Sequence, residues 1–428
     1  MTATHAVRLG CALFTLLLAS PAFAESGALV AGWAHACRIT PDERVECWGN
    51  NSGGTLPSAE GQLGDGTNVD RSVPGPVVGL PEPVRALAAG EEHTCAITVT
   101  GAVHCWGHNA FGQLGDGSGT NRLVATRVTA FAEPVSMITG GGYHSCAIVG
   151  ASRMVWCWGR NDSGQLGEAG VVGTDSLTPI VVASLGTNVS KVEAGGYHTC
   201  ALLPTGEVRC WGRNDHGQLG RAGGDDENPT PVTGLPANIQ SIAFGDAHGC
   251  ALDASGGVRC WGRGSDGQLG DGAQAQSTTP VQVSGLASGV RAISLGGGFS
   301  CAITFDGAGL CWGYNVRGAL GLGDQGNRSI PAPVIGLASG VQEFAGGSEY
   351  ACALNTAGAA TCTGNNPYGQ LGDGTTSDRA VHALIVNATR GTVTAGVTLR
   401  GAADDADDQA GASVAIGDDG GDETIAVG

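Results

Sequence analysis

The stretch "HTCAITVTGAVHCWGHNAFGQLGDG", His93 to Gly117, contains two cysteines separated by nine residues. Similar stretches occur six more times, and the first cysteine of each copy stands at positions 37, 95, 146, 200, 250, 301 and 352. The copies recur at intervals of 50 to 58 residues, a period typical of propellers and solenoids. Within each copy, a segment such as "VRALAAG" (84–90) precedes the cysteines and one such as "PVQVSGL" (280–286) follows them. This order predicts four short strands per copy, separated by Gly, Pro and Asn.

The two cysteines of a copy are predicted to face each other across a hairpin. Placing Cys95 opposite Cys105 leaves a three-residue loop that ends in Gly101, where such loops need a left-handed residue. Directly opposed residues on antiparallel strands have Cα atoms about 4.5–5.5 Å apart, which a disulfide tolerates. Zinc ligation is the alternative, although C-x9-C without a second close pair is not the spacing of a zinc site. The predicted disulfides are Cys37–Cys47, Cys95–Cys105, Cys146–Cys157, Cys200–Cys210, Cys250–Cys260, Cys301–Cys311 and Cys352–Cys362.

A tryptophan follows the second cysteine in six copies, and Thr363 replaces it in the seventh. Because successive strand residues point to opposite faces, each Trp lies on the face opposite its cysteine. This favours sheets that pack face to face. Closing the array removes its exposed edges. The sequence therefore predicts an all-β fold: a seven-bladed β-propeller of four-stranded antiparallel blades, with one disulfide per blade.

The ends of the chain differ from the repeats. Residues 1–24 combine Arg8, the apolar run "LGCALFTLLLAS" and "AFA" at 22–24, which is typical of a signal peptide. The propeller is expected over 25–387, and residues 388–428 form an acidic Gly/Ala/Asp-rich tail expected to be disordered. Removal of Cys11 leaves an even number of cysteines, which suits disulfides outside the cytoplasm. We expect an exported protein that is periplasmic, on the cell surface or secreted, with no membrane span.

The repeated motif H-x-C-A-I/L…C-W-G-x-N-x-x-G-Q-L-G-D-G resembles the repeat of the regulator of chromosome condensation family, over about residues 27–386. The resemblance implies a seven-bladed propeller. Phe299 and Tyr350 replace the repeat His, Gly264 replaces the Asn, and "GALGLGD" (318–324) departs from "GQLGDG". The founding member of the family is a nuclear exchange factor for a small GTPase. Similar exported bacterial propellers include one that inhibits β-lactamases through one mouth of its ring.

Composition and motifs limit the possible functions. A net charge of −18 argues against nucleic-acid binding, which needs a basic face. No catalytic motif stands out, and we expect no cofactor and no metal. The repeat histidines could form a metal-binding ring, but hydrogen bonding to a turn within the same blade is the preferred interpretation. The aspartates of "LGDG" are expected to bond their own turns rather than calcium. The members of these two groups are His35, His93, His144, His198 and His248, and Asp65, Asp116, Asp271 and Asp373.

One pair of positions varies between otherwise similar copies. It forms a two-residue turn between the Gly after the first strand and H-x-C, and all seven turns must gather at one mouth of a closed ring. Aromatic and acidic side chains on one rigid surface suit protein recognition. The candidate partner-binding residues are Trp33, Glu91, Glu92, Tyr143, Tyr197, Asp246 and Glu349. We therefore expect a monomeric, non-enzymatic scaffold that binds a protein or another macromolecule. A guanine-nucleotide exchange activity and an extracellular enzyme with catalytic residues at the channel mouth are the alternatives.

Overall fold

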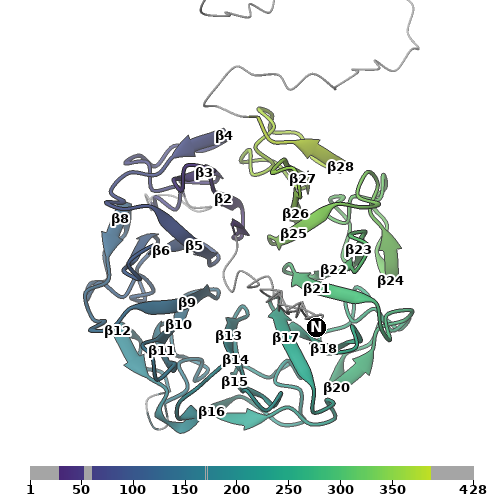
Figure 1. Ribbon diagram of the computed structural model, residues 1–428, viewed down its shortest axis with the longest axis horizontal. Helices are drawn as coiled ribbons and strands as arrows, with labels where there is room; N and C mark the ends of the chain where they lie inside the picture. Colours follow the sequence, from purple (N-terminus) through teal and green to yellow (C-terminus); the bar gives the residue numbers. More distant parts are fainter. Residues whose placement is uncertain (1–27, 53–59, 169, 171, 387–428) are drawn as a thin grey trace, which may run out of the picture.

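The computed structural model describes residues 28–52, 60–168, 170 and 172–386. Seven four-stranded antiparallel sheets stand around a central axis as the blades of a closed ring (Figure 1). Each blade consists of four strands that are consecutive in the sequence, with the first strand innermost and the fourth at the outer edge (Figure 1). The predicted seven-bladed propeller is confirmed.

The strands of the first four blades have the following bounds. Blade 1 comprises β1 (Leu29–Ala31), β2 (His35–Ile39), β3 (Val45–Gly49) and β4 (Arg71–Pro76). Blade 2 comprises β5 (Val84–Ala89), β6 (His93–Thr98), β7 (Val103–Gly107) and β8 (Arg122–Arg127). Blade 3 comprises β9 (Val135–Gly140), β10 (His144–Val149), β11 (Met154–Gly159) and β12 (Ser176–Val181). Blade 4 comprises β13 (Lys191–Ala194), β14 (His198–Leu202), β15 (Val208–Gly212) and β16 (Asp226–Pro231).

The remaining three blades repeat this pattern. Blade 5 comprises β17 (Ile239–Phe244), β18 (His248–Asp253), β19 (Val258–Gly262) and β20 (Ser277–Gln282). Blade 6 comprises β21 (Val290–Leu295), β22 (Phe299–Thr304), β23 (Gly309–Gly313) and β24 (Arg328–Pro333). Blade 7 comprises β25 (Val341–Gly346), β26 (Tyr350–Asn355), β27 (Ala360–Gly364) and β28 (Arg379–Leu384). Among the described residues, the structure contains one helix, the short 3-10 helix η1 (Ala183–Leu185).

The central hairpin of each blade has the predicted register. Cys95 pairs with Cys105 across β6 and β7, and Gly101 closes the loop with a φ of 85°. In the first blade Glu43 takes the same conformation with a φ of 60°, which is costly for a residue with a side chain. All seven predicted disulfides form, each with Cα atoms 4.1 Å apart, slightly closer than expected. The zinc alternative for the cysteines is wrong, because their sulfurs are bonded to each other.

The hydrophobic core lies between the blades. Seven clusters of buried side chains each join one blade to the next, and the six repeat tryptophans are fully buried in them. Each Trp Nε1 donates a hydrogen bond to the main-chain oxygen of the Gln in the "GQLG" segment of the preceding blade, as Trp106 does to Gln62 at 2.9 Å. The prediction that both faces of a blade are buried, with Trp filling one of them, is confirmed.

Blades 7 and 1 close the ring without exchanging a strand. Trp48 of blade 1 donates to the oxygen of Gln370 in blade 7 at 2.9 Å, which is the bond that links the other blades. The Tyr350 hydroxyl adds a hydrogen bond to the main-chain oxygen of His35. At the outer edge, the Gly374 amide donates to the oxygen of Ser72 at 3.0 Å. Closure therefore depends on side-chain packing and hydrogen bonds between the two blades.

Two sequence predictions fall outside the described residues. The signal peptide (1–24) and the whole acidic tail (388–428) lie there, and they stay predictions. Within the part of the chain that the structure describes, no helix has the length and apolar character needed to cross a bilayer.

Candidate functional site

The two-residue turns that vary between copies form the rim of one mouth of the ring, and we call them the rim turns. Their main chain is held by neighbouring blades. The Trp33 amide donates to the oxygen of Glu91 at 3.0 Å, and Gly142 donates to Gly196 at 2.9 Å. The Ser348 amide donates to Trp33 at 3.4 Å, which carries the pattern across the closure. Backbone atoms alone make these bonds, so they need no side-chain donor or acceptor at the rim.

The second residue of each rim turn is also held by its main chain. The oxygen of Glu92 accepts the amide of His108, and the oxygen of Tyr143 accepts that of Arg160, at 2.8 and 2.9 Å. The donor is in each case the residue between the Trp-Gly pair and the following Asn. A second variable position therefore lies beside every rim turn, and the mouth is broader than the seven turns alone.

The repeat histidines do not bond a turn in their own blade, so that part of the prediction is wrong. His93 Nε2 lies 2.8 Å from the Ser145 hydroxyl of the next blade. Ser145 in turn donates to the oxygen of Gln113, which also accepts Trp158 Nε1. Gly90 makes room for the ring, since a Cβ there would lie 2.1 Å from His93 Cε1. The histidines connect blades and do not converge on a common centre.

These His–hydroxyl pairs resemble a nucleophile and its base, but no substrate can reach them. His93 is 1% exposed and Ser145 is 0% exposed. The hydroxyl already donates to a main-chain oxygen, and the same arrangement recurs at four junctions. Burial lowers the pKa of His93 to about 3, so the ring is neutral at physiological pH. The pairs therefore stabilise the fold.

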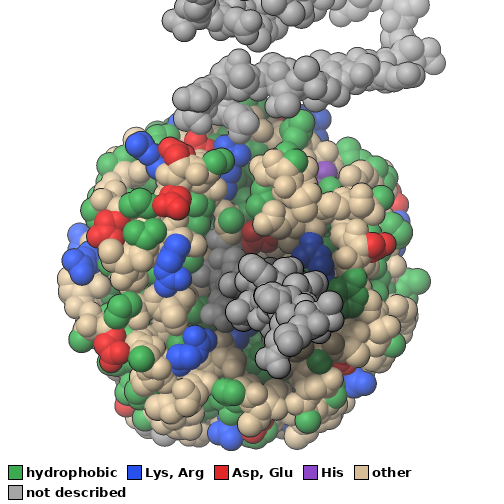
Figure 2. All heavy atoms as spheres, viewed as in Figure 1, with side chains coloured by type: hydrophobic (Ala, Val, Ile, Leu, Met, Phe, Trp, Pro, Cys, Tyr) green, Lys and Arg blue, Asp and Glu red, His purple; other side chains and the backbone are tan. Residues whose placement is uncertain are grey.

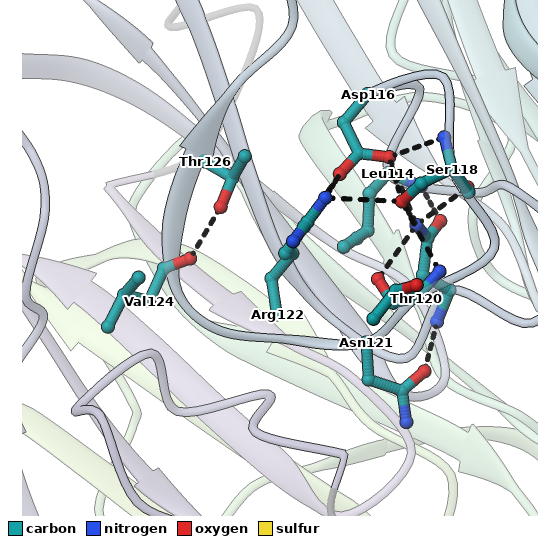
Figure 3. A network of polar contacts seen from close by, with 9 residues as sticks. Leu114, Asp116, Ser118, Thr120, Asn121, Arg122, Val124 and Thr126 are labelled. Carbon is teal, nitrogen blue, oxygen red and sulfur yellow. Dashed lines mark hydrogen bonds and ion pairs between the residues drawn. The ribbon is translucent and has the colours of Figure 1, made fainter.

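The "LGDG" aspartates bond their own turns, as expected. Asp116 Oδ1 accepts the amide and hydroxyl of Ser118, and Asp116 Oδ2 accepts Arg122 Nε at 2.7 Å (Figure 3). The Asn109 side chain completes the turn by bonding the main chain of Leu114, Ser118 and Thr120. Asp65 and Asp373 have the same kinds of partner, a threonine and an arginine, whereas Asp271 accepts only the Ala273 amide among the described residues.

Two predicted rim residues, Tyr143 and Tyr197, come together in an aromatic cluster. Their ring centroids are 6.4 Å apart, and Phe111 lies 5.3 Å from Tyr143. The Arg160 guanidinium lies over the Phe111 and Tyr197 rings, at 4.8 and 5.2 Å from their centroids. Such cation–π contacts fix both the arginine and the rings. The cluster is a rigid, half-buried surface at the rim of blades 2 to 4.

Sequence reasoning missed Phe111, Arg160 and His108, although a signal was present. Phe111 stands two residues before Gln113 of its "GQLG" segment, and the other two stand in the variable position of C-W-G-x-N. Both positions change from copy to copy as the rim turns do. A comparison of all variable positions, rather than of the turns alone, would have found them.

Two other predicted rim residues, Trp33 and Glu349, lie apart from this cluster. Trp33 is 39% exposed, and its ring centroid is 6.1 Å from that of Tyr368. The Glu349 carboxylate accepts a hydrogen bond from Asn365 Nδ2 at 3.0 Å. The mouth thus has several separate chemical features rather than one continuous patch.

Glu91 and Asp246 place two acidic groups at the narrow part of the mouth. Both line a central cavity of about 250 Å³. Burial raises the pKa of Glu91 to about 7, and the charges of Asp246 and Glu92 contribute to the shift. Asp246 is an exposed residue, and the protein around its carboxylate raises its pKa while the charge of Arg263 lowers it. Each carboxylate therefore loses part of the hydration that would stabilise its charge.

Glu92 belongs to the one group with the geometry of a metal site among the described residues. One ligand atom each from Glu60, Glu92 and His108 lies within 4.8 Å of the others. However, His108 Nδ1 already lies 2.7 Å from Gln113 Nε2, and Glu92 forms hydrogen bonds with Glu60 and Tyr143. The side chains thus satisfy one another, and the expectation of no metal stays a prediction.

Deeper in the channel, the acidic groups have partners in the inner strands. Glu193 forms an ion pair with Lys191 at 2.9 Å, and Lys191 also donates to the oxygen of Ile242. Burial raises the pKa of Glu343 to about 7, while the main-chain amides of Ala28 and Leu29 lower it.

On the face drawn in Figure 2, acidic and basic side chains are interspersed around the ring.

Comparisons with known proteins agree with this architecture. Residues 155–405 match the model of the RCC1-like domain. Residues 84–113 and 135–165, and residues 42–97 and 100–148, match two models of the regulator of chromosome condensation (RCC1) repeat. Prp20p from Saccharomyces cerevisiae superposes with a TM-score of 0.65 at 22% identity, over 75% of this chain and 80% of that one. Human WBSCR16 superposes with a TM-score of 0.66 at 24% identity, over 74% and 86%.

Similar sequences occur in proteins with different names. The Ultraviolet-B receptor UVR8 of Arabidopsis thaliana is 34% identical over 193 residues, which cover 44% of this chain and 42% of the receptor. The protein pim1 of Schizosaccharomyces pombe is 35% identical over 179 residues, or 39% of this chain and 31% of pim1. The match thus spans less than half the length of either relative. Because one family model covers more than half of the sequence, and because the repeats fold as its seven blades, this chain belongs to the family of RCC1-like domain proteins.

Proposed function

We propose that this protein is an exported scaffold that binds a protein partner through the mouth formed by the rim turns. The observation that carries the proposal is the contrast between main chain and side chains at the rim. The main-chain oxygen of the second rim-turn residue accepts the same main-chain hydrogen bond in all seven blades, whereas the side chains differ from blade to blade. A preorganised surface of this kind loses little entropy on binding.

The aromatic cluster supports a protein as the ligand. Tyrosines and an arginine with fixed geometry are the residue types that dominate the binding energy of protein interfaces. Prp20p of yeast has binding properties to Gsp1p and histones, and yeast RCC1 (Prp20) forms a complex with Kap60. Protein binding by proteins with this fold is therefore a precedent, but the fold alone does not identify the partner of this chain.

Export is part of the same proposal. The signal-peptide pattern at 1–24 supports it, and so do seven disulfides that use every cysteine of the described residues. Structural disulfides persist in oxidising compartments and are rare in the cytosol. An exchange-factor role and a channel-mouth enzyme remain alternatives, and no residue-level feature described above favours either one.

The proposal can be tested by capture from the culture medium and cell envelope of the native organism. Immobilised protein is compared with a variant that carries Glu91→Lys, Glu92→Lys, Tyr143→Ala and Tyr197→Ala. The variant should retain about tenfold less of any specific ligand, because it loses the anchors at the centre of the surface.

A matched control changes the opposite mouth. Val99 and Phe305 lie in hairpin loops at the other end of the strands and are 50% and 67% exposed. Val99→Ser with Phe305→Ser should leave capture unchanged. Equal capture by the rim variant and the native protein, or loss with the control alone, would assign binding to another surface.

A further inference from the structure

The narrow part of the mouth has an unusual charge arrangement. The first positions of the rim turns carry an acid in blades 2 and 5, Glu91 and Asp246, and glycine in blades 3, 4 and 6. The glycines keep the space between the acids open. A cavity of about 250 Å³ is smaller than the roughly 300–1,000 Å³ of small-molecule sites, but it can hold one long side chain.

The two carboxylates have similar surroundings. A Cβ on Gly142 would lie 3.0 Å from Glu91 Oε1, and a Cβ on Gly297 would lie 2.9 Å from Asp246 Oδ2. Each acid therefore lies over the glycine of the following blade, at the edge of the cavity. Since the glycines add no side chain above them, the carboxylates stay accessible from the mouth.

Neither acid has an ion-pair partner within 4.0 Å among the described residues. The nearest relevant cations are committed elsewhere. Arg160 pairs with Asp162 at 2.6 Å, and Arg263 pairs with Asp266 at 3.0 Å. Burial raises the pKa values of Glu91 and Asp246, and the charge of Asp246 raises that of Glu91 further. Arg160 and the Tyr143 hydroxyl lower the pKa of Glu91, and Arg263 lowers that of Asp246, but these effects are smaller than the effect of burial.

We propose that the cavity at the mouth receives one lysine or arginine side chain of a protein partner, which lies between Glu91 and Asp246. The inference rests on the proposed function and specifies the chemistry of its ligand. A cation would relieve the repulsion between the two carboxylates and replace the water they lack. The exposed indole of Trp33, whose amide already bonds Glu91, provides an aromatic face for the same cation.

The separation of the two acids favours a side chain over a free metal ion as the ligand. The acids stand in blades 2 and 5, three blades apart, and they do not belong to the metal-like group of Glu60, Glu92 and His108. A flexible side chain can hydrogen-bond both carboxylates through its several donors, whereas a metal ion needs ligands around one centre.

The test uses two fluorescent pentapeptides, Gly-Gly-Arg-Gly-Gly and the same sequence with citrulline, each blocked at both ends. Their affinities for the full chain are measured by fluorescence anisotropy at pH 8. The arginine peptide should bind about tenfold more tightly than the citrulline peptide, because citrulline has the same shape without the charge. The double variant Glu91→Gln, Asp246→Asn should remove this difference.

Two controls separate loss of charge from loss of fold. Glu349→Gln removes another rim acid, which Asn365 already engages, and should leave the preference for arginine unchanged. The double variant itself should unfold at a higher temperature than the native protein at pH 8, because it loses the partly buried charge of Glu91 and the repulsion of that charge by Asp246. Equal binding of the two peptides to the native protein, or an intact preference in the double variant, would overturn the inference.

The outcomes also distinguish this inference from the proposed function. If the four-substitution rim variant loses partner capture while the Glu91→Gln, Asp246→Asn variant captures normally, the mouth binds a protein but the cation site is wrong. An arginine preference that depends on Glu91 and Asp246, with no loss of partner capture in the rim variant, would support the cation site and contradict the wider role of the mouth.

Discussion

The junction of blades 7 and 1 and the junction of blades 6 and 7 differ in the contact between their two blades. At the junction of blades 7 and 1, Trp48 bonds the oxygen of Gln370 at 2.9 Å, although the sequence does not continue from one blade to the other. At the junction of blades 6 and 7, which the chain joins directly, Thr363 replaces the Trp and Ala319 replaces the Gln. The Trp–Gln hydrogen bond is thus kept at the junction that no chain connection spans. It is lost at the 6–7 junction, although the other chain-joined junctions keep it.

The 6–7 junction is not simply weaker, because smaller groups fill the space. The Thr363 hydroxyl lies 3.0 Å from the oxygen of Gly318 and 2.9 Å from that of Arg379. His382 occupies the place beside Gly321 that a Trp occupies at the other junctions, with its Cδ2 2.9 Å from a Cβ built there. The 6–7 junction therefore replaces the Trp with other side chains that fill the same space. The chain connection also holds these two blades together.

The largest effect is expected at the closing junction. Trp48→Ala should cost about 3–5 kcal/mol of unfolding free energy, since it removes a fully buried aromatic ring and a hydrogen bond. Urea unfolding measures the loss, and hydrogen exchange should increase first in blades 1 and 7. Trp261→Ala, at a junction that the chain spans, is the matched control. Exchange that begins in the middle blades of the Trp48 variant would contradict the role of this junction in closure.

Loss of a disulfide should have the next largest effect. Replacing Cys352 and Cys362 by alanine should cost about 2–3 kcal/mol, as the chain-entropy model gives for a loop of this length. Blade 7 has no Trp on its own strands to compensate, so its loss should at least equal that of Cys250→Ala with Cys260→Ala. Denaturant unfolding without reductant compares the two. A blade 7 variant as stable as the native protein would show that the bridge is dispensable there.

The junctions should also differ in their response to acid. Burial lowers the pKa of His248 to about 3, whereas the unfolded chain has a His pKa of about 6.5. The unfolded state therefore binds more protons, and stability falls as the pH drops from about 6.5 towards 3. Phe299 and Ala351 stand at the 6–7 junction where His248 and Ser300 stand at the 5–6 junction.

Transferring that pair tests the difference. His248→Phe with Ser300→Ala should lose about 1 kcal/mol less stability than the native protein between pH 6.5 and 5.5. Unfolding free energies at the two pH values measure the effect, and Ser300→Ala alone is the control. An unchanged pH dependence in the double variant would mean that His248 is protonated in the folded state.

The smallest effect is expected at the filled 6–7 junction. Thr363→Val keeps the shape but removes the hydroxyl that bonds two main-chain oxygens. The cost should be no more than about 1 kcal/mol, because only hydrogen bonds to carbonyls are lost. Thermal unfolding should show a shift much smaller than that of Trp48→Ala. A comparable shift would mean that Thr363 holds the blades together as Trp does elsewhere.

The fold could be predicted from sequence because the repeat contains its own register. Gly101 needs a left-handed conformation, and this fixes the hairpin that brings Cys95 and Cys105 together. Contacts between blades were harder to predict. His93 bonds Ser145, which is 52 residues away, and nothing within one copy specifies this partner.

The candidate site could be predicted only in part. Topology alone places the rim turns at one mouth, so Tyr143 and Glu91 were found. The cluster around Arg160 depends on how neighbouring blades are rotated against each other, which a single copy does not specify. The raised pKa of Glu91 could not be predicted either, because burial at the mouth is its main cause and Asp246 adds to it from another blade.

The main-chain bonds of the rim have a consequence for how such proteins diversify. Under the proposed function, substitutions at the turn positions that already carry a side chain, such as Trp33 and Ser348, can alter what the ring recognises while the main-chain bonds of the turns stay in place. New specificities can then arise one residue at a time at these positions.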